Sequence, residues 1–550
     1  MKKSLALFIA AAILFSAIPL SSVRALEADP PLKIGLYYGT NAMISANLQN
    51  VAGMASGYQL GYYDSSRNFI PLLQTDEIYL TVVKDKNIYI GSGKVYYDSK
   101  PSSYNSVIGA YHLQLDSVPA SLAAAQNLAA SLTSAGIPAF VAYTSAGYRV
   151  RAGNYTSAIE AAADSARVSS ITGSTASTVG ESRSCYTVTI TETNTILFEL
   201  DMGGQALGIL PNSQKTWFKN HTYYGGFEYS RVSGNDITVI NVVSMDDYLK
   251  GVIPYEMSPS WPVEALKAQA LCAKSYAVNS IGKHKSQGFD LCNTTDCQVY
   301  YGTQNASANS DSAVEAVSGL YITYEGKPAE TFYHASSGGW TEDVKNIWGS
   351  DIPYLKAVED KYLTDFRPYS FTLTLDEVTS ILKSKGYNVS EIVDFYASGI
   401  TPAGNVNEVT FVQENGETLV FSGDKARTCL NTSSSTKRIN SHRYTITSDS
   451  RLYVNDTWLD KSISQYYAIG SDKTPAALNG SGLYVISGDK KISALDLSGS
   501  GSGVYTISGT GAGHNIGMSQ CGANAMAKLG FSYDEIIKFY FTGVQVGPAN

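Results

Sequence analysis

Apolar and polar residues alternate in short stretches over about residues 30–100, where Gly, Asn, Asp and Ser repeatedly break the pattern. Stretches such as KIGLYYG and EIYLTVV have the period of two residues that half-buried strands require. The pattern therefore predicts a β-rich N-terminal region, and it assigns that region no chemistry.

The pattern changes over residues 105–170. A strand, GAYHLQL, precedes an alanine-rich helix at about 119–135, two strands follow within FVAYTSAGYRVRAGNY, and a second helix begins at Thr156. This order predicts a small βαββα repeat. The Ser- and Thr-rich residues that come next predict a linker over 171–184.

Residues 185–550 read as one large domain. Alternating stretches such as TVTITETNTILFEL and DITVINVV predict strands, LDEVTSILKSKG predicts a helix, and a Gly-rich loop that begins at Gly511 leads into two further helices. The Gly- and Ser-rich residues from about 449 to 502 predict a peripheral β-hairpin insertion. The chain as a whole is therefore expected to be a multidomain α+β protein.

A strong helix signal follows a carboxylate, Glu256, that we place in a turn. The helix is predicted from Pro262 to about Ile281, because Pro suits the first helical turn. On a helical wheel Lys267 and Lys274 fall inside the apolar arc. Either their stems pack and their amines reach solvent, or they face a cleft that holds an anion or a carboxylate such as Glu256.

The N-terminus has the pattern of a secretory signal peptide over residues 1–25. Lys2 and Lys3 precede an apolar run from Leu5 to Leu20, and Ala25 offers a small residue for cleavage. The alternative is an uncleaved membrane anchor, since the run is only slightly shorter than a membrane span. Both interpretations predict an extracytoplasmic protein, secreted or held at the cell surface.

Composition narrows the class of partner. A net charge of −8 argues against nucleic acid or an anionic membrane surface as the main partner. The chain has 39 tyrosines and only 17 phenylalanines, a balance that suits hydrated aromatic surfaces and carbohydrate contacts. Its 6 cysteines are too few and too scattered for a small disulfide scaffold.

Short apolar and Gly positions in the βαββα repeat resemble those of the sporulation-related repeat. The resemblance rests on Tyr148-Arg149-Val150 with Gly153, and on Leu128, Leu132 and Gly136. Modules of this family bind glycan strands that have lost their stem peptides. The resemblance therefore implies that peptidoglycan glycan strands are a partner.

The region from about Cys185 to Val546, apart from the insertion, resembles the family of stage II sporulation protein D and the amidase enhancers. Five blocks carry this resemblance in the family's order: Tyr248–Val252 with Pro254–Met257, Glu264–Ala270, Cys297–Tyr300, Ser336–Gly339 with Thr341 and Glu342, and His514–Ala523. The sporulation protein is a lytic transglycosylase of peptide-free strands, whereas amidase enhancers stimulate cell-wall amidases.

The resemblance implies that Glu256 is the catalytic acid, and the chemistry fits. A carboxyl can protonate a glycosidic oxygen near neutral pH only if burial raises its pKa, and Pro254, Tyr255, Met257 and Trp261 are expected to form the apolar wall. A lytic transglycosylase needs no second carboxylate, because the 6-hydroxyl of muramic acid attacks the anomeric carbon.

Three alternatives to this function stay open. A non-catalytic protein would bind peptidoglycan and recruit or stimulate a cell-wall amidase or another wall hydrolase. A structural role would leave Glu256 to brace the following helix. A hydrolytic glycosidase would need a second carboxylate; the first candidates are Asp246, Asp247 and Glu342.

Further residues follow from the same resemblance. The substrate cleft is expected to contain Lys267, Lys274, Ser337, His514 and Gln520. The family's sporulation protein binds zinc through a His and two Cys, which correspond here to His284, Cys292 and Cys297. Three such ligands and a water suit tetrahedral Zn²⁺, but a disulfide between the two cysteines is an equal alternative in a secreted chain.

Three positions depart from the family's pattern. Lys274 stands where Arg is usual and lacks the planar fork that grips a carboxylate in two places. Asn515 replaces a Gly in the C-terminal loop, where Asn tolerates a positive φ. Cys521 replaces a frequent Trp and leaves one wall of the cleft undefined.

Overall fold

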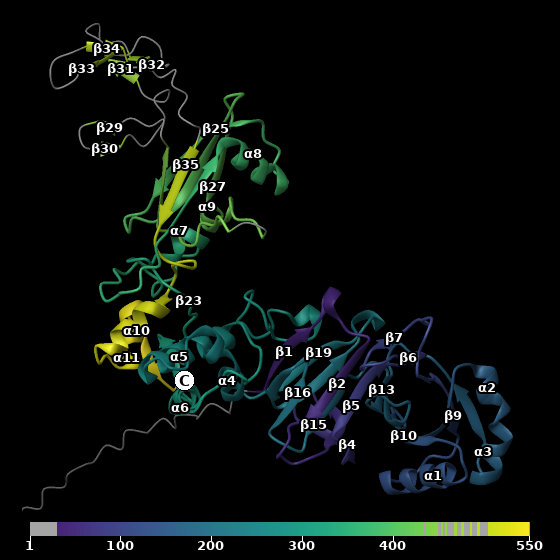
Figure 1. Ribbon diagram of the computed structural model, residues 1–550. Helices are drawn as coiled ribbons and strands as arrows, with labels where there is room; N and C mark the ends of the chain where they lie inside the picture. The colour runs from purple at the N-terminus through teal and green to yellow at the C-terminus, as the bar shows by residue number, and fades with distance from the viewer. Residues whose placement is uncertain are drawn as a thin grey trace, which may run out of the picture.

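The computed structural model describes residues 30–433, 436–448 and 504–548, together with six short strands between 453 and 494 (Figure 1). The signal peptide predicted over 1–25 lies outside the described residues. Among the helices that are described, none is long and apolar enough to cross a membrane.

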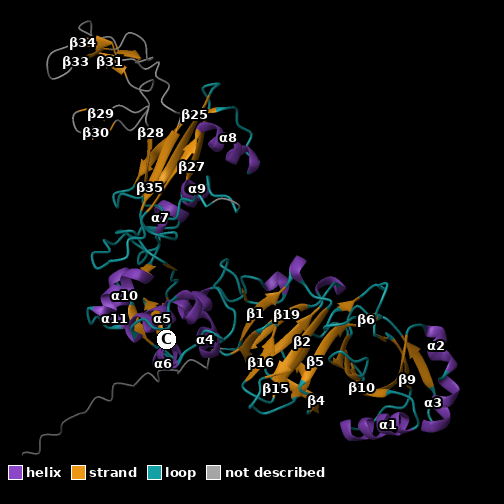
Figure 2. Ribbon diagram, in the orientation of Figure 1, coloured by secondary structure: helices purple, strands orange, loops and turns teal. Residues whose placement is uncertain are grey.

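Two large sheets dominate the N-terminal half, and both are mostly antiparallel (Figure 2). The seven-stranded sheet contains, in spatial order, β20 (Leu291–Cys292), β1 (Leu32–Tyr37), β19 (Thr238–Val243), β18 (Gly226–Ser230), β15 (Leu207–Pro211), β3 (Tyr58–Tyr63) and β4 (Phe69–Thr75). The ten-stranded sheet contains β12 (Ala176–Val179), β9 (Tyr111–Leu115), β11 (Gly147–Tyr155), β10 (Ala139–Thr144), β14 (Ile196–Asp201), β13 (Tyr186–Ile190), β5 (Tyr79–Lys84), β2 (Ser45–Asn50), β16 (Lys215–Phe218) and β17 (His221–Tyr224).

The boundary predicted at residue 185 does not separate two sheets. Strands β1, β2, β3 and β5, which precede the repeat, pair with β19, β16, β15 and β13, which follow it; Leu32, for example, lies opposite Val243. Buried apolar strands need a neighbour on each side, and here they find it far along the chain. The β-rich region and the start of the large domain are therefore one body, into which the repeat is inserted.

The repeat has the predicted βαββα order, with the second helix split in two and an extra edge strand. It contains α1 (Leu122–Ser134), α2 (Ala158–Ala163) and α3 (Ser165–Thr172) beside strands β9, β10 and β11. The extra strand, β12, pairs with β9, so residues 176–179 are not linker as we predicted. A polar ASTV stretch serves here as an edge strand, which needs only one buried neighbour.

A buried ionic cluster joins the repeat to the rest of the large sheet. Strand β10 of the repeat runs parallel to β14, and the Arg151 guanidinium on β11 forms 2.7 Å ion pairs with Glu199 and with Asp201 on β14. The repeat therefore shares one continuous sheet with β2, β5 and β16 and is not joined to them through a flexible linker alone.

Helices surround a central helix beyond the sheets. Helix α5 (Val263–Asn279) contacts α4 (Met245–Glu256), α6 (Ala308–Ala316), α10 (Gln520–Lys528) and α11 (Tyr533–Tyr540). Eleven of its 17 residues are buried, as expected for a helix enclosed by neighbours. Strand β19 leads directly into α4. The Ser244 side chain caps the N-terminus of α4 by accepting a hydrogen bond from the Asp247 backbone N–H. The position of α4 is thus fixed by the buried sheet.

A second core forms a separate arm (Figure 1). Its sheets contain β24 (Tyr369–Thr374), β35 (Val504–Gly509) and β28 (Tyr444–Ser448), and β25 (Ile392–Ile400), β26 (Val406–Gln413) and β27 (Thr418–Ser422). Helices α8 (Leu375–Ser384) and α9 (Asp424–Thr428) pack on them. The insertion predicted over about 449–502 lies between the paired strands β28 and β35, and only its short strands are described.

The remaining elements are short. They are β6 (Ile88–Ile90), β7 (Tyr96–Tyr97) and β8 (Ser106–Ile108); β21 (Tyr321–Tyr324), β22 (Lys327–Pro328) and β37 (Gln545–Gly547); β23 (Tyr333–His334) and β36 (Met518–Ser519); α7 (Val344–Trp348); and, within the insertion, β29 (Tyr453–Val454), β30 (Thr457–Trp458), β31 (Tyr467–Ile469), β32 (Pro475–Ala477), β33 (Tyr484–Ile486) and β34 (Ile492–Ala494).

Candidate functional site

Glu256 is the last residue of helix α4, not part of a turn as we predicted. The helix continues through Pro254 and ends at Glu256, because the next residue, Met257, has an extended backbone and two prolines follow. Because α4 continues a buried strand, the carboxylate is held by a rigid element.

The Glu256 carboxylate lines a cavity of about 490 Å³ between the central helices and the C-terminal loop. Three elements that lie far apart in the sequence meet there: the end of α4, the loop before residue 300, and the segment around Phe332. The lining residues are Glu256, Tyr276, Lys283, Thr295, Asp296, Cys297, Gln298, Phe332, Tyr333, Trp348 and His514. We call this space the Glu256 cavity.

Burial raises the pKa of the Glu256 carboxyl above its usual range, although hydrogen bonds from Gln520 and from the backbone of Val299 lower it in part. The Gln520 side-chain amide donates to the carboxylate over 3.4 Å and lies equally close to the Gln269 oxygen. Within the described residues Glu256 forms no ion pair. A carboxyl in this setting stays protonated to a higher pH than an exposed one.

The apolar wall that we predicted from Pro254, Tyr255, Met257 and Trp261 does not line the cavity. Tyr255 instead contacts Tyr301, with ring centroids 5.5 Å apart, and Trp261 does not line the cavity. The wall consists of Tyr276, Phe332, Tyr333 and Trp348. Residues next to Glu256 in sequence point away because consecutive side chains on a helix lie about 100° apart.

Lys267 and Lys274 do not line the Glu256 cavity, which corrects their predicted position. Lys267 bonds Glu264 over 2.8 Å and lies over the Tyr533 ring, and the buried Lys274 amine lies 4.3 Å from the Tyr321 ring centroid. The cavity instead faces Tyr276, which lies two residues beyond Lys274 on α5 and hence about 200° around the helix.

Ser337 is also placed outside the cavity. Its buried hydroxyl donates to Asp360 over 2.6 Å, and the same carboxylate accepts from Tyr540. This network braces the loop against α11.

His514 lines the cavity, as predicted. Its Nδ1 accepts from the backbone N–H of Ile516 over 3.1 Å, so in the neutral ring the proton lies on Nε2. Burial and the nearby His334 hold the pKa of His514 well below its usual range. His514 is therefore a neutral hydrogen-bonding group beside Trp348, whose ring centroid is 5.1 Å away.

The C-terminal loop tolerates its departure from the family's pattern. Asn515 has a φ of 62°, a left-handed conformation that Asn accepts more readily than most residues. Its side-chain amide donates to the carbonyls of Ser337 and Trp340, which fixes the loop. Cys521 contacts Asp365 rather than the cavity, and the indole on this side of the site is that of Trp348.

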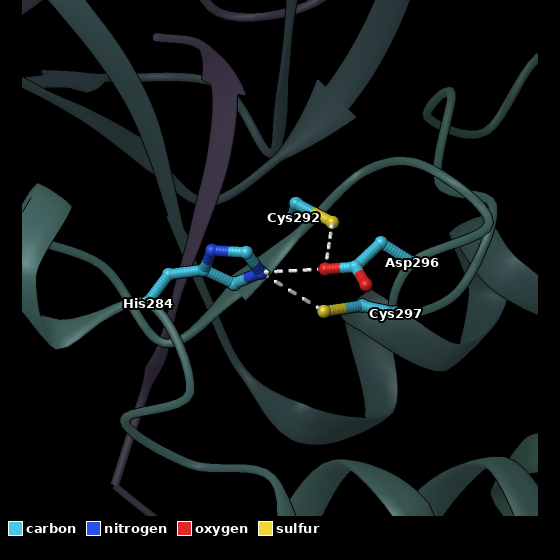
Figure 3. Close-up of side chains that lie close together, drawn as sticks. All are labelled: His284, Cys292, Asp296 and Cys297. Atoms are coloured by element: carbon cyan, nitrogen blue, oxygen red, sulfur yellow. Dashed lines mark hydrogen bonds and ion pairs between the residues drawn. The ribbon is translucent and has the colours of Figure 1, made fainter. Parts of the chain in front are cut away.

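His284, Cys292 and Cys297 come together as predicted, and Asp296 joins them (Figure 3). The Nε2 of His284 lies 3.3 Å from the Cys297 sulfur and 3.3 Å from Asp296 Oδ2. One ligand atom from each of the four residues lies within 4.8 Å of the others. Asp296 and Cys297 also line the Glu256 cavity, so this cluster forms part of its wall.

The donor set fits a tetrahedral zinc ion. Zn²⁺ bonds of 2.0 to 2.3 Å place neighbouring ligands roughly 3.3 to 3.8 Å apart. The His284 nitrogen lies 3.3 Å from both Cys297 and Asp296, and the Cys292 sulfur lies 4.0 Å from Asp296. The hydrogen bond between the two thiols lowers the pKa of Cys292 and raises that of Cys297, so Cys292 is the cysteine more readily present as the thiolate that binds metal. Both cysteines are free thiols in the structure, without the alternative disulfide.

A glycine on β1 helps to position the histidine. Strand β20 lies beside β1, with Gly35 opposite Cys292. A Cβ on Gly35 would come within about 2.5 Å of the Phe289 ring, which stacks on His284 with centroids 5.1 Å apart. Because Gly35 has no side chain, the Phe289 ring has room to stack on His284 and orient it.

The carboxylates considered for hydrolysis lie elsewhere. Asp246 and Asp247 start α4, about 14 Å of helix from Glu256. Glu342 is buried and accepts hydrogen bonds from Thr401 and Asn405. Sequence reasoning missed Asp296, the other carboxylate that lines the cavity. The sequence feature that could have identified Asp296 is its position directly before Cys297.

The chain resembles proteins of known families in two places. Residues 233–324 match the family described as "Stage II sporulation protein", SpoIID, and residues 108–179 match the SPOR domain, which confirms both resemblances. The chain is 33% identical over 297 residues to the Amidase enhancer of Bacillus subtilis, covering 54% of this chain and 39% of that protein.

Two other relatives match over more of their length. The chain is 25% identical over 323 residues to the Stage II sporulation protein D of Bacillus subtilis, covering 56% of this chain and 76% of that protein. It is 28% identical over 368 residues to an uncharacterized protein of Brachyspira hyodysenteriae, covering 66% of this chain and 83% of that protein.

Proposed function

We propose that this chain, which carries a SpoIID domain and a SPOR domain, is a lytic transglycosylase that cleaves peptide-free glycan strands of peptidoglycan at the cell wall. The observation that carries the proposal is the Glu256 carboxyl. It ends a rigid helix, lies in an aromatic-walled cavity, forms no ion pair with described residues and has a raised pKa.

In the first step the protonated Glu256 carboxyl donates its proton to the glycosidic oxygen that leaves the anomeric carbon of muramic acid. The C–O bond breaks, and positive charge develops on the sugar ring. The Glu256 carboxylate formed in this step stabilises that charge, and the amide of Gln520 holds the carboxylate in place.

In the second step the 6-hydroxyl oxygen of the same muramic acid forms a bond to the anomeric carbon. Glu256 accepts the hydroxyl proton and returns to its starting form. The product carries a 1,6-anhydro ring, and no water is consumed. One carboxyl thus serves both steps. Asp246, Asp247 and Glu342 lie outside the cavity, and Asp296, the other carboxylate that lines it, pairs with Lys283.

The remaining cavity residues suit a sugar ligand. Tyr276, Phe332 and Trp348 offer ring faces to the apolar C–H faces of sugars, and Trp348 is 39% exposed. The Nε2–H of His514 is available as a hydrogen-bond donor to a sugar hydroxyl. The SPOR domain would hold the same strand through a separate contact.

Zinc, if bound, would be held by His284, Cys292, Cys297 and Asp296. Its contribution there is to lock the loop that forms one wall of the Glu256 cavity. Asp296 is 62% exposed at its side chain and pairs with Lys283 over 3.3 Å, so it is the ligand most readily exchanged for water.

The relative named Amidase enhancer supports a second candidate function. In that case the chain would bind peptidoglycan and stimulate a cell-wall amidase without cutting strands itself. The two candidates differ in whether the purified chain produces new strand ends.

The test is to incubate the purified chain with peptide-free glycan strands and identify the new ends by mass spectrometry. We expect 1,6-anhydromuramic ends, and fewer of them from strands that keep their stem peptides. Absence of new ends, with amidase activity raised when an amidase is added, would instead favour the enhancer.

Replacing Gln520 with Leu is expected to shift the pH dependence of cleavage. The Gln520 amide stabilises the charged form of Glu256, so its loss raises the pKa of the acid further. Activity, which requires protonated Glu256, should then persist to a higher pH than in the wild type. The measurement is the rate of anhydromuramic product formation across pH.

An unchanged alkaline limb in Gln520→Leu would contradict this role. Gln304→Leu, a change to an exposed Gln that pairs with His221, serves as the control and should leave the profile unchanged.

A further inference from the structure

A second groove lies on the β-rich N-terminal body, away from the Glu256 cavity. Its volume is about 600 Å³, within the range of small-ligand sites. Its floor is the face of β16, β2 and β5, and its wall is the turn between β6 and β7. The proposed reaction uses none of its residues.

The floor is a row of side chains set by strand register. Trp217 on β16 lies opposite Gln49 on β2, and Gln49 lies opposite Tyr79 on β5. All three line the groove. Since neighbouring strands are about 4.8 Å apart, the backbone positions of Trp217 and Tyr79 are separated by about 10 Å, with that of Gln49 between them.

The wall is held rigidly on this floor. Tyr96 is buried, and its hydroxyl lies 3.1 Å from the Thr81 hydroxyl and accepts from the Glu192 backbone N–H over 2.9 Å. The turn that Tyr96 ends carries Lys94, whose amine lies 5.2 Å from the Tyr79 ring centroid. The groove is therefore formed before any ligand arrives.

Some polar groups of the groove are engaged: the Asp236 carboxylate pairs with Lys84, and Asn47 accepts from the Thr81 hydroxyl. Others remain available to a ligand. Within the described residues the Gln49 side chain makes no hydrogen bond, and neither Lys94 nor Lys219 forms an ion pair. Tyr79 is 38% exposed and Trp217 is half-buried. These groups suit a sugar chain that carries carboxylates. The two ring faces can pack on the C–H surfaces of sugars, and the Gln49 amide can hydrogen-bond to hydroxyls. The two lysines at the rim can pair with the carboxylates.

We propose that this groove binds an acidic saccharide strand through Trp217, Gln49 and Tyr79, with Lys94 and Lys219 contacting its carboxylates. The identity of that strand as peptide-free peptidoglycan, whose muramic acids carry free lactyl groups, rests on the proposed function. Because β2, β5 and β16 share one sheet with the SPOR domain, one long strand can occupy both contacts on a single rigid body.

The test measures binding by calorimetry with full-length protein in which Glu256→Gln prevents strand consumption. Peptide-free glycan strands and neutral chitooligosaccharides are the two probes. Trp217→Ala should weaken binding of long strands at least about tenfold, because one of two linked contacts is lost. Gln49→Ala, a smaller change that leaves the rings in place, should weaken it in the same direction.

The charge is tested by Lys219→Glu, an exposed change that should weaken binding of the acidic strands and leave chitooligosaccharide binding unchanged. Tyr97→Ala removes a ring that is 40% exposed outside the groove and is the matched control. Unchanged strand affinity in both Trp217→Ala and Gln49→Ala would overturn the proposal, and so would an equal loss in Tyr97→Ala. Unchanged acidic-strand binding in Lys219→Glu would overturn the assignment of an acidic ligand.

These binding results do not depend on catalysis. If the wild type yields no anhydromuramic ends while Trp217→Ala loses affinity, the proposed function fails and the groove assignment stands. If cleavage is observed and affinity is unchanged in the groove variants, the reverse holds.

Discussion

Glu256→Gln is expected to lower the rate of anhydromuramic product formation at least about 100-fold. Gln has the size and hydrogen-bonding shape of Glu but carries no proton that can be transferred, and general acid catalysis contributes roughly 10² to 10⁴ to such rates. The measurement is the initial rate of new strand ends by mass spectrometry at saturating substrate.

Two controls separate this loss from damage to the fold. Glu315→Gln, a change to an exposed carboxylate that pairs with Lys250 over 2.8 Å, should keep full activity. Glu256→Gln should also melt at an equal or higher temperature than the wild type at mildly alkaline pH. Burial raises the folded-state pKa of Glu256 above its unfolded value, so the wild type loses stability as pH rises through the folded pKa, and the neutral variant does not. Full activity in Glu256→Gln would remove Glu256 from the reaction.

Metal content gives the second large effect. Protein purified without chelator is expected to carry about one zinc per chain. Cys292→Ser or Cys297→Ser is expected to lower zinc affinity by more than about tenfold, because mutation of residues that only orient metal ligands already lowers metal affinity about 10 to 100-fold. His284→Ala should do the same, because its ring nitrogen lies within 4.8 Å of the other three donor atoms. The measurement is metal analysis with a competing chelator.

Cys429→Ala, which changes a buried cysteine of the separate arm, should keep the zinc. A metal-free protein whose peptide maps show a bond between Cys292 and Cys297 would contradict the zinc assignment. Cleavage by metal-free protein at the wild-type rate would show that the metal does not support the cavity wall.

The sequence predicted the residues of the site better than their arrangement. Short motifs pointed to the Glu256 carboxylate and to the cluster of His284, Cys292 and Cys297, because a motif fixes both the residue types and their spacing. Lys267 and Lys274 were placed wrongly because periodicity gives the apolar arc of α5 but not which neighbour covers it. Helices α4, α6, α10 and α11 pack around α5, and the cavity lies on the arc of Tyr276.

Long-range pairing explains the other differences. The repeat follows a local pattern, and its order was predicted. The two sheets were not predicted, because β1 pairs with β19 across some two hundred residues and the sequence of neither strand identifies the strand it pairs with. Trp348 was missed for another reason: it packs on Phe332, with ring centroids 4.7 Å apart, from a short helix that carried no motif.

The most direct measurement of the central claim is cleavage of peptide-free strands in water labelled with heavy oxygen. A transglycosylase closes the ring with the sugar's own 6-hydroxyl, so the new ends should be 1,6-anhydromuramic acid without label. Labelled reducing ends would contradict the account, because they would show that water attacks the anomeric carbon and that a second group, with Asp296 the first to test, activates it.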